Sequence, residues 1–404
     1  FGGSFLMDDY KEKFSVEMLA KKFPQKFILE TPDSLKFLQS LGRSWRMNWG
    51  KAGKRLIGIT GSNAKTTTKE MLANFLEAIY AGKVLCTQGN LNNHIGVPLT
   101  LLSLRDHHEV AVIEMGSNHP GEISLLCELA KPNAGIITNV GDAHLEFFKN
   151  REGVFAEKST LFTSVVEGAN PNAIFAVNSD DHYLRGLRHA TLFTGITTYG
   201  KQFAEYVFKI DQQQILIKVK NSEVILKNEN IFGGHNFFNL GAAFSLAHKM
   251  YPQKLHELAA AATIFKPTAN RSSWVEKDQI KILMDAYNAN PSSMLTAITA
   301  FAEYLVSNKI SMQDSLIIIG DMNELGETAQ SAHEAIGHEL RTFGFSNVVF
   351  VGRYASCYEK GWKQPAKTYA NVADVKRDSI ELFKNIKVAF LKASRSVGLE
   401  KLLV

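Results

Sequence analysis

Residues Leu56–Thr68 read LIGITGSNAKTTT, an apolar strand followed by a small polar loop and the start of a helical run. A chain wraps a polyphosphate in this way, because N–H groups of the loop and the first helical turn point inward and the helix dipole adds positive charge. Lys65 can reach terminal phosphates, and the hydroxyl of Thr66 or Thr67 can ligate Mg²⁺. The stretch therefore predicts a nucleotide phosphate site.

The loop departs from the strict phosphate-loop pattern at two positions. Ile59 and Ala64 stand where that pattern has glycine, and of its glycines only Gly61 is kept, followed by Ser62 and Asn63. Taken alone, the loop also fits an ordinary strand–turn–helix connection.

Length and composition narrow the class of protein. A chain of 404 residues predicts two or three domains, and 45% hydrophobic with 21% charged residues is typical of a globular protein. No apolar run approaches the roughly 20 residues of a membrane span. The net charge of +5 is spread along the chain, which argues against nucleic acid as a partner.

The chain opens Phe1-Gly2-Gly3 without an initiator Met, so we expect residues to be missing before it.

The cysteines bear on the compartment. There are three, Cys86, Cys127 and Cys357, far apart and without metal-ligand spacing. This pattern favours reduced, structural thiols in a cytoplasmic protein.

From Arg55 onward, short apolar strands alternate with helical stretches, which predicts an α/β fold with a mainly parallel sheet. The expected strands are 56–60, 110–114, 135–139 and 174–178, and the expected helices are 67–80, 120–129 and 153–162. Residues 206–210 and 215–219 alternate around a polar turn and suggest an antiparallel edge or a small second sheet. Before all of these, Ser34–Trp45 reads as an amphipathic helix with Ser34 as N-cap and Gly42 weakening its last turn.

Residues 266–273 have the composition of a linker, and the strand–helix alternation restarts after them. Strands are expected at 280–285, 316–320, 348–352 and 388–392, which predicts a second, Rossmann-like α/β domain. No glycine-rich dinucleotide fingerprint follows these strands, so NAD binding is not supported.

Polar residues follow several strand ends, where open α/β sheets bind ligands. Glu114 closes a strand that can lie beside the phosphate-loop strand and can hold Mg²⁺, although a surface glutamate is the simpler interpretation. His144, between Asp142 and Glu146, can ligate a metal. By its position on a helix, Lys158 reads as a solvated lysine. Arg271, in the linker, can clamp a phosphate when two domains close.

Three further polar blocks follow strands of the second domain, namely 285–291, 320–326 and 392–395. The amides and the carboxylate of the first can bind ribose or a peptide, while polar surface loops account for each block singly.

Taken together, these blocks resemble the ATP-dependent Mur ligases of peptidoglycan synthesis. The matching stretches run in family order: Thr60–Thr67, Gly89–Pro98, Glu114–Ile123, Ala143–Glu146, Gly234–Asn236, Tyr287–Pro291, Gly320–Gly326 and Lys392–Arg395. The Asn92-Asn93 and Tyr287–Pro291 blocks are specific to the branch of the family that adds D-alanyl-D-alanine.

The resemblance implies three domains: a partial N-terminal UDP-sugar-binding α/β domain (1–50), a central ATP-binding domain (51–267) and a C-terminal Rossmann-like ligase domain (268–404). It implies a cytoplasmic monomer that joins D-alanyl-D-alanine to the carboxylate of UDP-N-acetylmuramoyl-tripeptide through an acyl phosphate. Neither a nucleic acid nor a membrane span belongs to this expectation.

The resemblance also assigns site residues. ATP contacts are expected from Gly61, Ser62, Asn63, Lys65, Thr66, Thr67, Asn139, Asn239, Arg271 and Asp285. Two Mg²⁺ ions are expected on Thr66, Glu114, His144 and Lys158, with Lys158 carbamylated, and the catalytic set is Lys65, Glu114, His144 and Lys158. Substrate contacts are expected from Asn92, Asn93, Ser117, Tyr287, Asn288, Asn290 and Glu324.

The chain departs from the family pattern at four positions. Ala64, Asn270 and Ala393 replace glycines, and Thr160 replaces an acid that is common after the modified lysine. If position 64 needs a positive φ, alanine there costs about 1–2 kcal/mol, whereas alanine is tolerated if the position already lies in the first helical turn. Three alternatives stay open: another Mur-type amino-acid ligase, a non-catalytic binding protein on the same fold, and a plain phosphate-loop kinase.

Overall fold

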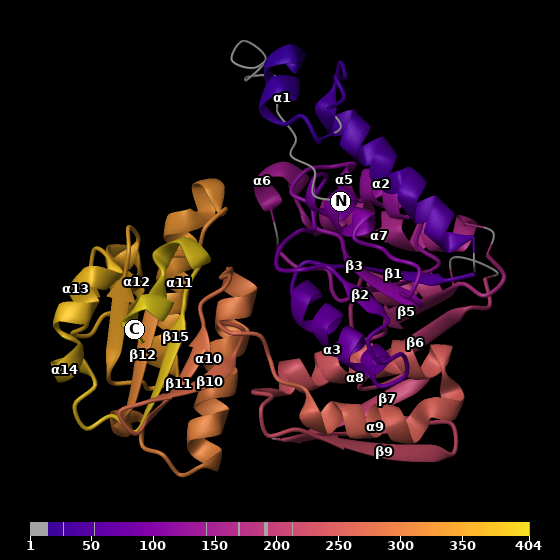
Figure 1. Cartoon of the computed structure of the whole chain (residues 1–404). Helices are drawn as coiled ribbons and strands as arrows, with labels where there is room; N and C mark the ends of the chain where they lie inside the picture. Colours follow the sequence, from indigo (N-terminus) through magenta and orange to yellow (C-terminus); the bar gives the residue numbers. More distant parts are fainter. Residues whose placement is uncertain are drawn as a thin grey trace.

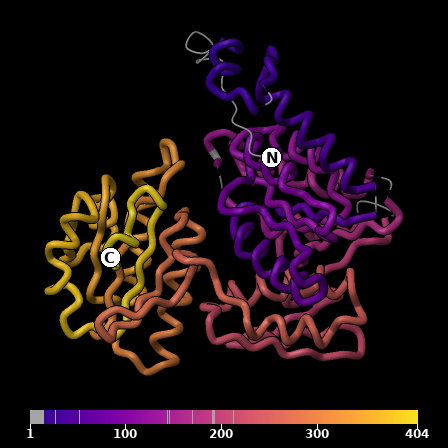
Figure 2. Tube along the Cα trace, viewed as in Figure 1, coloured from indigo at the N-terminus to yellow at the C-terminus, as the bar shows by residue number. Residues whose placement is uncertain are grey.

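The computed structural model describes residues 15–403 except 27, 52, 143, 169, 190–192 and 212. Two lobes lie side by side, joined by the segment between α9 (Leu255–Ile264) and β10 (Ser273–Lys277), as Figure 1 shows. Figure 2 follows the same two lobes along the Cα trace, the second in orange to yellow. The first lobe contains a nine-stranded sheet and the second a six-stranded sheet, which confirms the predicted α/β class.

The first lobe is a mainly parallel sheet with an antiparallel edge. Its strand order is β2-β3-β1-β4-β5-β6-β7-β8-β9, and only the β7–β8 and β8–β9 pairs are antiparallel. The strands are β1 (Arg55–Thr60), β2 (Val84–Cys86), β3 (Val110–Glu114), β4 (Ala134–Ile137), β5 (Ile174–Asn178), β6 (Ile196–Gly200), β7 (Tyr206–Asp211), β8 (Gln214–Val219) and β9 (Ser222–Lys227). The hairpin predicted at 206–219 is thus the edge of the same sheet.

Helices cover both faces of this sheet (Figure 1). The helices of this lobe are α1 (Val16–Lys22), which lies away from the sheet, α2 (Ser34–Gly50), α3 (Lys65–Glu77), α4 (Gly96–Leu102), α5 (Glu122–Ala130), α6 (Leu145–Phe148), α7 (Arg151–Glu167), α8 (Gly234–Met250) and α9. Ile57 and Ile59 of β1 belong to the core formed with α3, α8 and α9, whereas Leu56 belongs to the core formed with α5 and α7. Because β1 is covered on both faces, it reads as a continuous apolar run in the sequence.

The second lobe is parallel apart from its first strand. Its order is β10-β11-β15-β12-β13-β14, with β10 antiparallel to β11. Its strands after β10 are β11 (Ile280–Asp285), β12 (Ser315–Gly320), β13 (Val348–Val351), β14 (Lys367–Tyr369) and β15 (Val388–Lys392). Its helices are α10 (Pro291–Ser307), α11 (Ala329–Thr342), α12 (Ala355–Trp362), α13 (Val372–Arg377) and α14 (Ser379–Leu382).

Helix α2 differs from its prediction at both ends. Its N-cap is Asp33, whose carboxylate accepts from Lys36 N at 2.9 Å, so the prediction of Ser34 as N-cap is wrong by one residue. The helix also continues past Gly42 to Gly50. Glycine at position 42 lets α2 approach α4 closely, because a Cβ there would lie 3.0 Å from Pro98 Cα. Arg46 then fastens α2 to the first lobe by donating to Ala130 O at 2.8 Å.

Within the part that the structure describes, no helix is both long and apolar enough to cross a bilayer. The Phe1–Phe5 stretch and Ala143 of the resemblance blocks lie outside the described residues.

Candidate active site

The phosphate loop joins β1 to α3 and is braced by the loop that follows β4. Gly61 has φ 145°, and a Cβ there would lie 2.0 Å from Thr138 Oγ1, so only glycine fits. Ser62 Oγ accepts from Gly141 N at 2.8 Å, and Asn63 N donates to Asn139 Oδ1 at 3.0 Å. The side chain of Asn139, predicted as an ATP contact, thus lines the cleft and binds the backbone of the loop.

Ala64 adopts a left-handed conformation, with φ 63° and ψ 6°. The first turn of α3 follows, so the N–H groups of Lys65, Thr66 and Thr67 have no intrahelical acceptor and are available to an anion. Position 64 therefore has the positive φ that is unfavourable for alanine. Asn270 likewise has φ 65°, where asparagine is tolerated better than most residues.

Changing Ala64→Gly is expected to stabilise the protein by about 0.5–1 kcal/mol, because relief of left-handed strain exceeds the entropy that glycine adds to the unfolded chain. Chemical denaturation measures the change in the free energy of unfolding. The same substitution within α3, Ala73→Gly, should instead destabilise by about 1 kcal/mol. A destabilised Ala64→Gly variant would contradict the strain.

Lys65 folds back over its own loop. Its Nζ donates to Gly61 O at 2.8 Å and to Ser62 O at 3.1 Å. Burial lowers the pKa of Lys65, with Arg271 acting in the same direction and Glu114 and Glu324 opposing it. An ammonium held at the mouth of the loop is placed to exchange these carbonyl groups for phosphate oxygens.

Glu114 lies at the centre of the site. The register of β1 and β3 pairs it with Ile59, at the carboxyl end of the sheet. Its Oε1 accepts from Thr66 Oγ1 at 3.0 Å and from Asn92 Nδ2 at 2.8 Å. Its Oε2 is buried without a hydrogen-bond partner, 3.8 Å from Lys69 Nζ.

The donors around Glu114 suit Mg²⁺. A buried carboxylate oxygen with no hydrogen bond and an adjacent threonine hydroxyl are hard oxygen ligands of the kind that Mg²⁺ takes. Among the described residues, no three His, Cys, Asp or Glu side chains cluster to form a closed metal site. This fits an ion that keeps waters and substrate phosphates as its other ligands.

Lys158 is buried, so its interpretation as a solvated lysine is wrong. It is 1% exposed on α7, its Nζ donates to Ser117 Oγ at 2.6 Å, and it lies 5.8 Å from the Phe148 ring centroid. Burial, with help from Lys65, lowers its pKa to about 7. A large fraction of this amine is therefore neutral near neutral pH.

His144 pairs across the cleft between the lobes. Its Nδ1 lies 3.1 Å from Glu324 Oε2, and the hydrogen bond lowers the pKa of Glu324. The structure thus joins a predicted metal residue to a predicted substrate residue. Asp142, next to His144, forms an ion pair with Arg151.

The second lobe presents a set of fixed polar groups to the cleft. Asp285 accepts from Ser272 N at 3.1 Å and from Lys392 Nζ at 2.5 Å, so the linker is fastened to β11 and β15. Arg271 stacks over the Tyr287 ring with 3.6 Å between its Cζ and the ring centroid. Ala393, which replaces a glycine, is accommodated because Gly320 faces it: a Cβ at 320 would lie 2.7 Å from Ala393 Cβ.

Several predicted residues have local partners. Asn93 Oδ1 accepts from Gly96 N at 2.8 Å at the start of α4. Asn239 Nδ2 donates to Asn236 Oδ1 at 3.3 Å on α8. Asn288 Oδ1 accepts from Ala289 N at 2.9 Å. Thr160 donates to Ala156 O within α7 at 3.3 Å.

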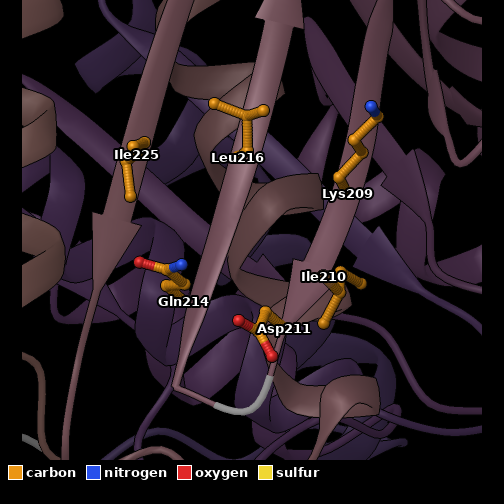
Figure 3. A pocket seen from close by; sticks show the side chains of 6 residues that line it. All are labelled: Lys209, Ile210, Asp211, Gln214, Leu216 and Ile225. Atoms are coloured by element: carbon orange, nitrogen blue, oxygen red, sulfur yellow. The ribbon is translucent and has the colours of Figure 1, made fainter.

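One cleft of about 1480 Å³ gathers these groups from both lobes. It is lined by every predicted site residue except Gly61, Lys158 and Asn290. A separate hollow of about 250 Å³ lies over β7, β8 and β9, where Leu216 and Ile225 stand near Lys209 and Asp211 (Figure 3). The large cleft alone contains the phosphate loop and is the candidate active site.

Sequence reasoning missed residues that support the site. Lys69 is 2% exposed beside Glu114 and donates to Thr87 O at 2.7 Å, and its position four residues after Lys65 on one helix face was an available signal. His235 lines the cleft, and burial lowers its pKa to about 4. Lys392 is buried against Asp285, which its pattern at a strand end did not indicate.

Comparisons with known proteins identify the family of the chain. Residues 59–247 match the Mur ligase middle domain, and residues 270–401 match the Mur ligase glutamate ligase domain. The UDP-N-acetylmuramoyl-tripeptide–D-alanyl-D-alanine ligase of Bacillus subtilis (strain 168) is 30% identical over 384 residues, which are 93% of this chain and 80% of that protein.

Solved structures give the same result. A crystal structure of MurF from Acinetobacter baumannii superposes with a TM-score of 0.80 at 28% identity, covering 93% of this chain and 80% of that one. MurF from Thermotoga maritima in complex with ADP gives a TM-score of 0.76 at 26% identity, covering 94% and 86%. The chain therefore belongs to the Mur ligase family.

Proposed function

We propose that this protein is an ATP-dependent amide ligase that joins D-alanyl-D-alanine to the carboxylate of UDP-N-acetylmuramoyl-tripeptide. The observation that carries the proposal is the single cleft in which the phosphate loop, the buried Glu114 and the fixed polar groups of the second lobe converge. The relatives' names, and the ADP in one related structure, support the same activity.

In the first step, a carboxylate oxygen of the tripeptide attacks the γ-phosphorus of ATP. An O–P bond forms, the bond to the β-phosphate oxygen breaks, and ADP and an acyl phosphate result. Lys65 is positioned to leave its loop carbonyls and neutralise the transferring phosphoryl group, while the first-turn N–H groups of α3 hold the phosphates.

Thr66 and Glu114 would hold one Mg²⁺, and His144 and Lys158 are proposed for a second. Bound Mg²⁺ supplies charge neutralisation on the phosphates and orients them for in-line transfer. Asn92 and Lys69 hold the Glu114 carboxylate in place from two sides. Gly61, Ser62, Asn63, Thr67, Asn139, Asn239, Arg271 and Asp285 are proposed as further nucleotide contacts.

In the second step, the amine of D-alanyl-D-alanine attacks the acyl carbonyl carbon. A C–N bond forms through a tetrahedral intermediate, the bond to the phosphate oxygen breaks, and the nitrogen loses a proton as phosphate leaves. Asn93, Ser117, Tyr287 and Asn288 are proposed to orient the two substrates, because alignment of two reactants lowers the barrier by several kcal/mol.

We also propose that Lys158 is carbamylated. The neutral amine would attack CO₂, forming an N–C bond and releasing a proton, and the resulting anion could serve as a metal ligand. A buried lysine with a depressed pKa supports this, as does the hydroxyl of Ser117 at 2.6 Å.

Carbamylation of Lys158 is expected to increase as the pH rises from 6 to 8, because the reactive neutral amine accumulates above a pKa of about 7. Carbon-13 NMR of protein equilibrated with ¹³C-bicarbonate should show a carbamate signal that grows over this range. A Lys158→Met variant should lack the signal. A signal that is absent in the parent protein, or that falls with rising pH, would contradict the proposal.

We also propose a domain division at residues 50 and 267, a monomeric state and a cytoplasmic location. The first division falls after α2, and the second falls between α9 and β10. Cys86, Cys127 and Cys357 are free thiols, as suits a reducing compartment.

Phosphate release tests the choice of amine. With ATP, Mg²⁺ and UDP-N-acetylmuramoyl-tripeptide present, D-alanyl-D-alanine should stimulate release, whereas D-alanine, L-lysine and diaminopimelate should not. Stimulation by a single amino acid instead would identify another Mur-type ligase.

A further inference from the structure

The side chain of Asn290 crosses from the second lobe to the phosphate loop. Its Nδ2 donates to Asn63 Oδ1 at 2.7 Å, a contact between residues 227 positions apart. The donor precedes α10 in the second lobe, and the acceptor lies between β1 and α3 in the first. The contact therefore links the position of one lobe directly to the loop that carries Lys65.

Asn63 accepts this hydrogen bond through its side chain, and its backbone is fixed within the first lobe. Its N–H donates to Asn139 Oδ1 at 3.0 Å, and its carbonyl accepts from Thr138 Oγ1 at 2.6 Å. A shift of the Asn63 backbone would have to break these hydrogen bonds or move the left-handed residue that follows it.

Asn290 is an equally fixed donor. It is the N-cap of α10, where its Oδ1 accepts from Ser293 N at 2.8 Å and its own N–H donates to Ser293 Oγ at 3.0 Å. Since Oδ1 is committed to the helix, the amide orientation is set and Nδ2 must face Asn63. These contacts use one Nδ2–H and one Oδ1 lone pair, and Asn290 is not among the residues that line the cleft.

A second contact between the lobes lies nearby. His144 of the first lobe pairs with Glu324 of the second, and a Cβ on Gly326 would lie 3.8 Å from the Glu146 carboxylate. Phe232 of the first lobe also packs against Trp274 and Tyr304 of the second. Among these contacts between the lobes, Asn290 supplies the one on the phosphate loop.

We propose that Asn290 is a positioning residue that holds the second lobe at a fixed position relative to the phosphate loop, and is not a substrate contact. This inference rests on the proposed function in one respect: the loop must bind the phosphates of ATP. With the lobes in register, Arg271 and the Asp285–Lys392 pair are held at a fixed distance from those phosphates. The interpretation of Asn290 as a dipeptide contact, which its sequence block suggested, is replaced.

The test is the substitution Asn290→Asp. It keeps the oxygen that caps α10 and removes only the Nδ2 donor, and it places a carboxylate opposite Asn63 Oδ1. Asn371→Asp is the matched control, because Asn371 also caps a helix through Oδ1 and donates Nδ2 to a neighbour, Asp374 Oδ2, at 2.8 Å. Asn290→Ser can cap α10 but is too short to reach Asn63. It is neutral, so it separates the loss of the contact from any effect of the negative charge that Asn290→Asp adds.

Two readouts are required. In steady-state ligation, Asn290→Asp should lower kcat and raise KM for ATP, each by about three- to ten-fold, with KM for D-alanyl-D-alanine within about two-fold of the parent. Hydrogen–deuterium exchange of the nucleotide-free protein should become about three- to ten-fold faster in residues 61–67. Asn290→Ser should show the same changes in kcat, in KM for ATP and in exchange as Asn290→Asp. Asn371→Asp should match the parent in both readouts.

Two outcomes overturn the proposal: a rise confined to KM for D-alanyl-D-alanine, or unchanged exchange in the phosphate loop of both Asn290 variants. Failure of the proposed function is seen separately, as absence of ligation by the parent protein. In that case the exchange experiment still tests the contact between Asn290 and the loop.

Discussion

Replacing Lys65 with alanine is expected to lower the ligation rate by on the order of 1000-fold or more, with the fold intact. The ammonium now held by Gly61 O and Ser62 O lies in the phosphate loop, where it can bind the transferred phosphoryl group. Its removal takes away one of the positive charges that stabilise the negative charge on the phosphoryl oxygens in the transition state. The ligation rate is measured with a coupled assay of ADP release, and circular dichroism and thermal melting establish that the variant is folded.

The control for this prediction is Lys83→Ala, an exposed lysine between α3 and β2. It should retain the parent rate. A Lys65→Ala protein that ligates at a near-normal rate would contradict the role of this residue.

The second large effect is expected from Glu114→Gln. The amide oxygen can still accept from Thr66 and Asn92, but the buried oxygen without a partner becomes an NH₂ group and the negative charge is lost. We expect the rate to fall by about 100- to 1000-fold. The Mg²⁺ concentration for half-maximal activity should also rise, because a ligand of the ion has been removed.

Titration of activity with Mg²⁺ measures this shift. Glu109→Gln is the matched control, since Glu109 immediately precedes β3 at the end away from the cleft. An unchanged Mg²⁺ dependence in Glu114→Gln would exclude Glu114 as a ligand.

The parts of the structure that the sequence predicted best are those set by local pattern. The buried parallel strands were found at or within two residues of their bounds, as for 110–114 and 388–392, because strands covered on both faces are continuous apolar runs. Glu114 was placed beside the phosphate-loop strand because parallel strands align their carboxyl ends at one edge. The error at the start of α2 is small: Asp33 and Ser34 are both good caps.

What the sequence could not supply depends on distant partners. Lys158 is buried by Ser117, 41 positions away, and by Phe148, so no local pattern on α7 distinguished it from a surface lysine. Only the family resemblance identified it. The left-handed conformation of Ala64 was one of two alternatives, and the bracing of Asn63 by Asn139 decides between them.

The contact between Asn63 and Asn290 could not be foreseen for the same reason. Both residues lie in blocks that read as ligand-binding, and their 227-position separation hides the hydrogen bond that joins them.

The central claim, that this cleft joins a tripeptide carboxylate to a dipeptide amine with ATP, is tested most directly by mass spectrometry of the product. The protein should convert ATP, UDP-N-acetylmuramoyl-tripeptide and D-alanyl-D-alanine into one new species whose mass is the sum of the two substrates less one water, with one ADP and one phosphate released per product. ATP hydrolysis without this species, or no reaction by a folded protein, would contradict the account.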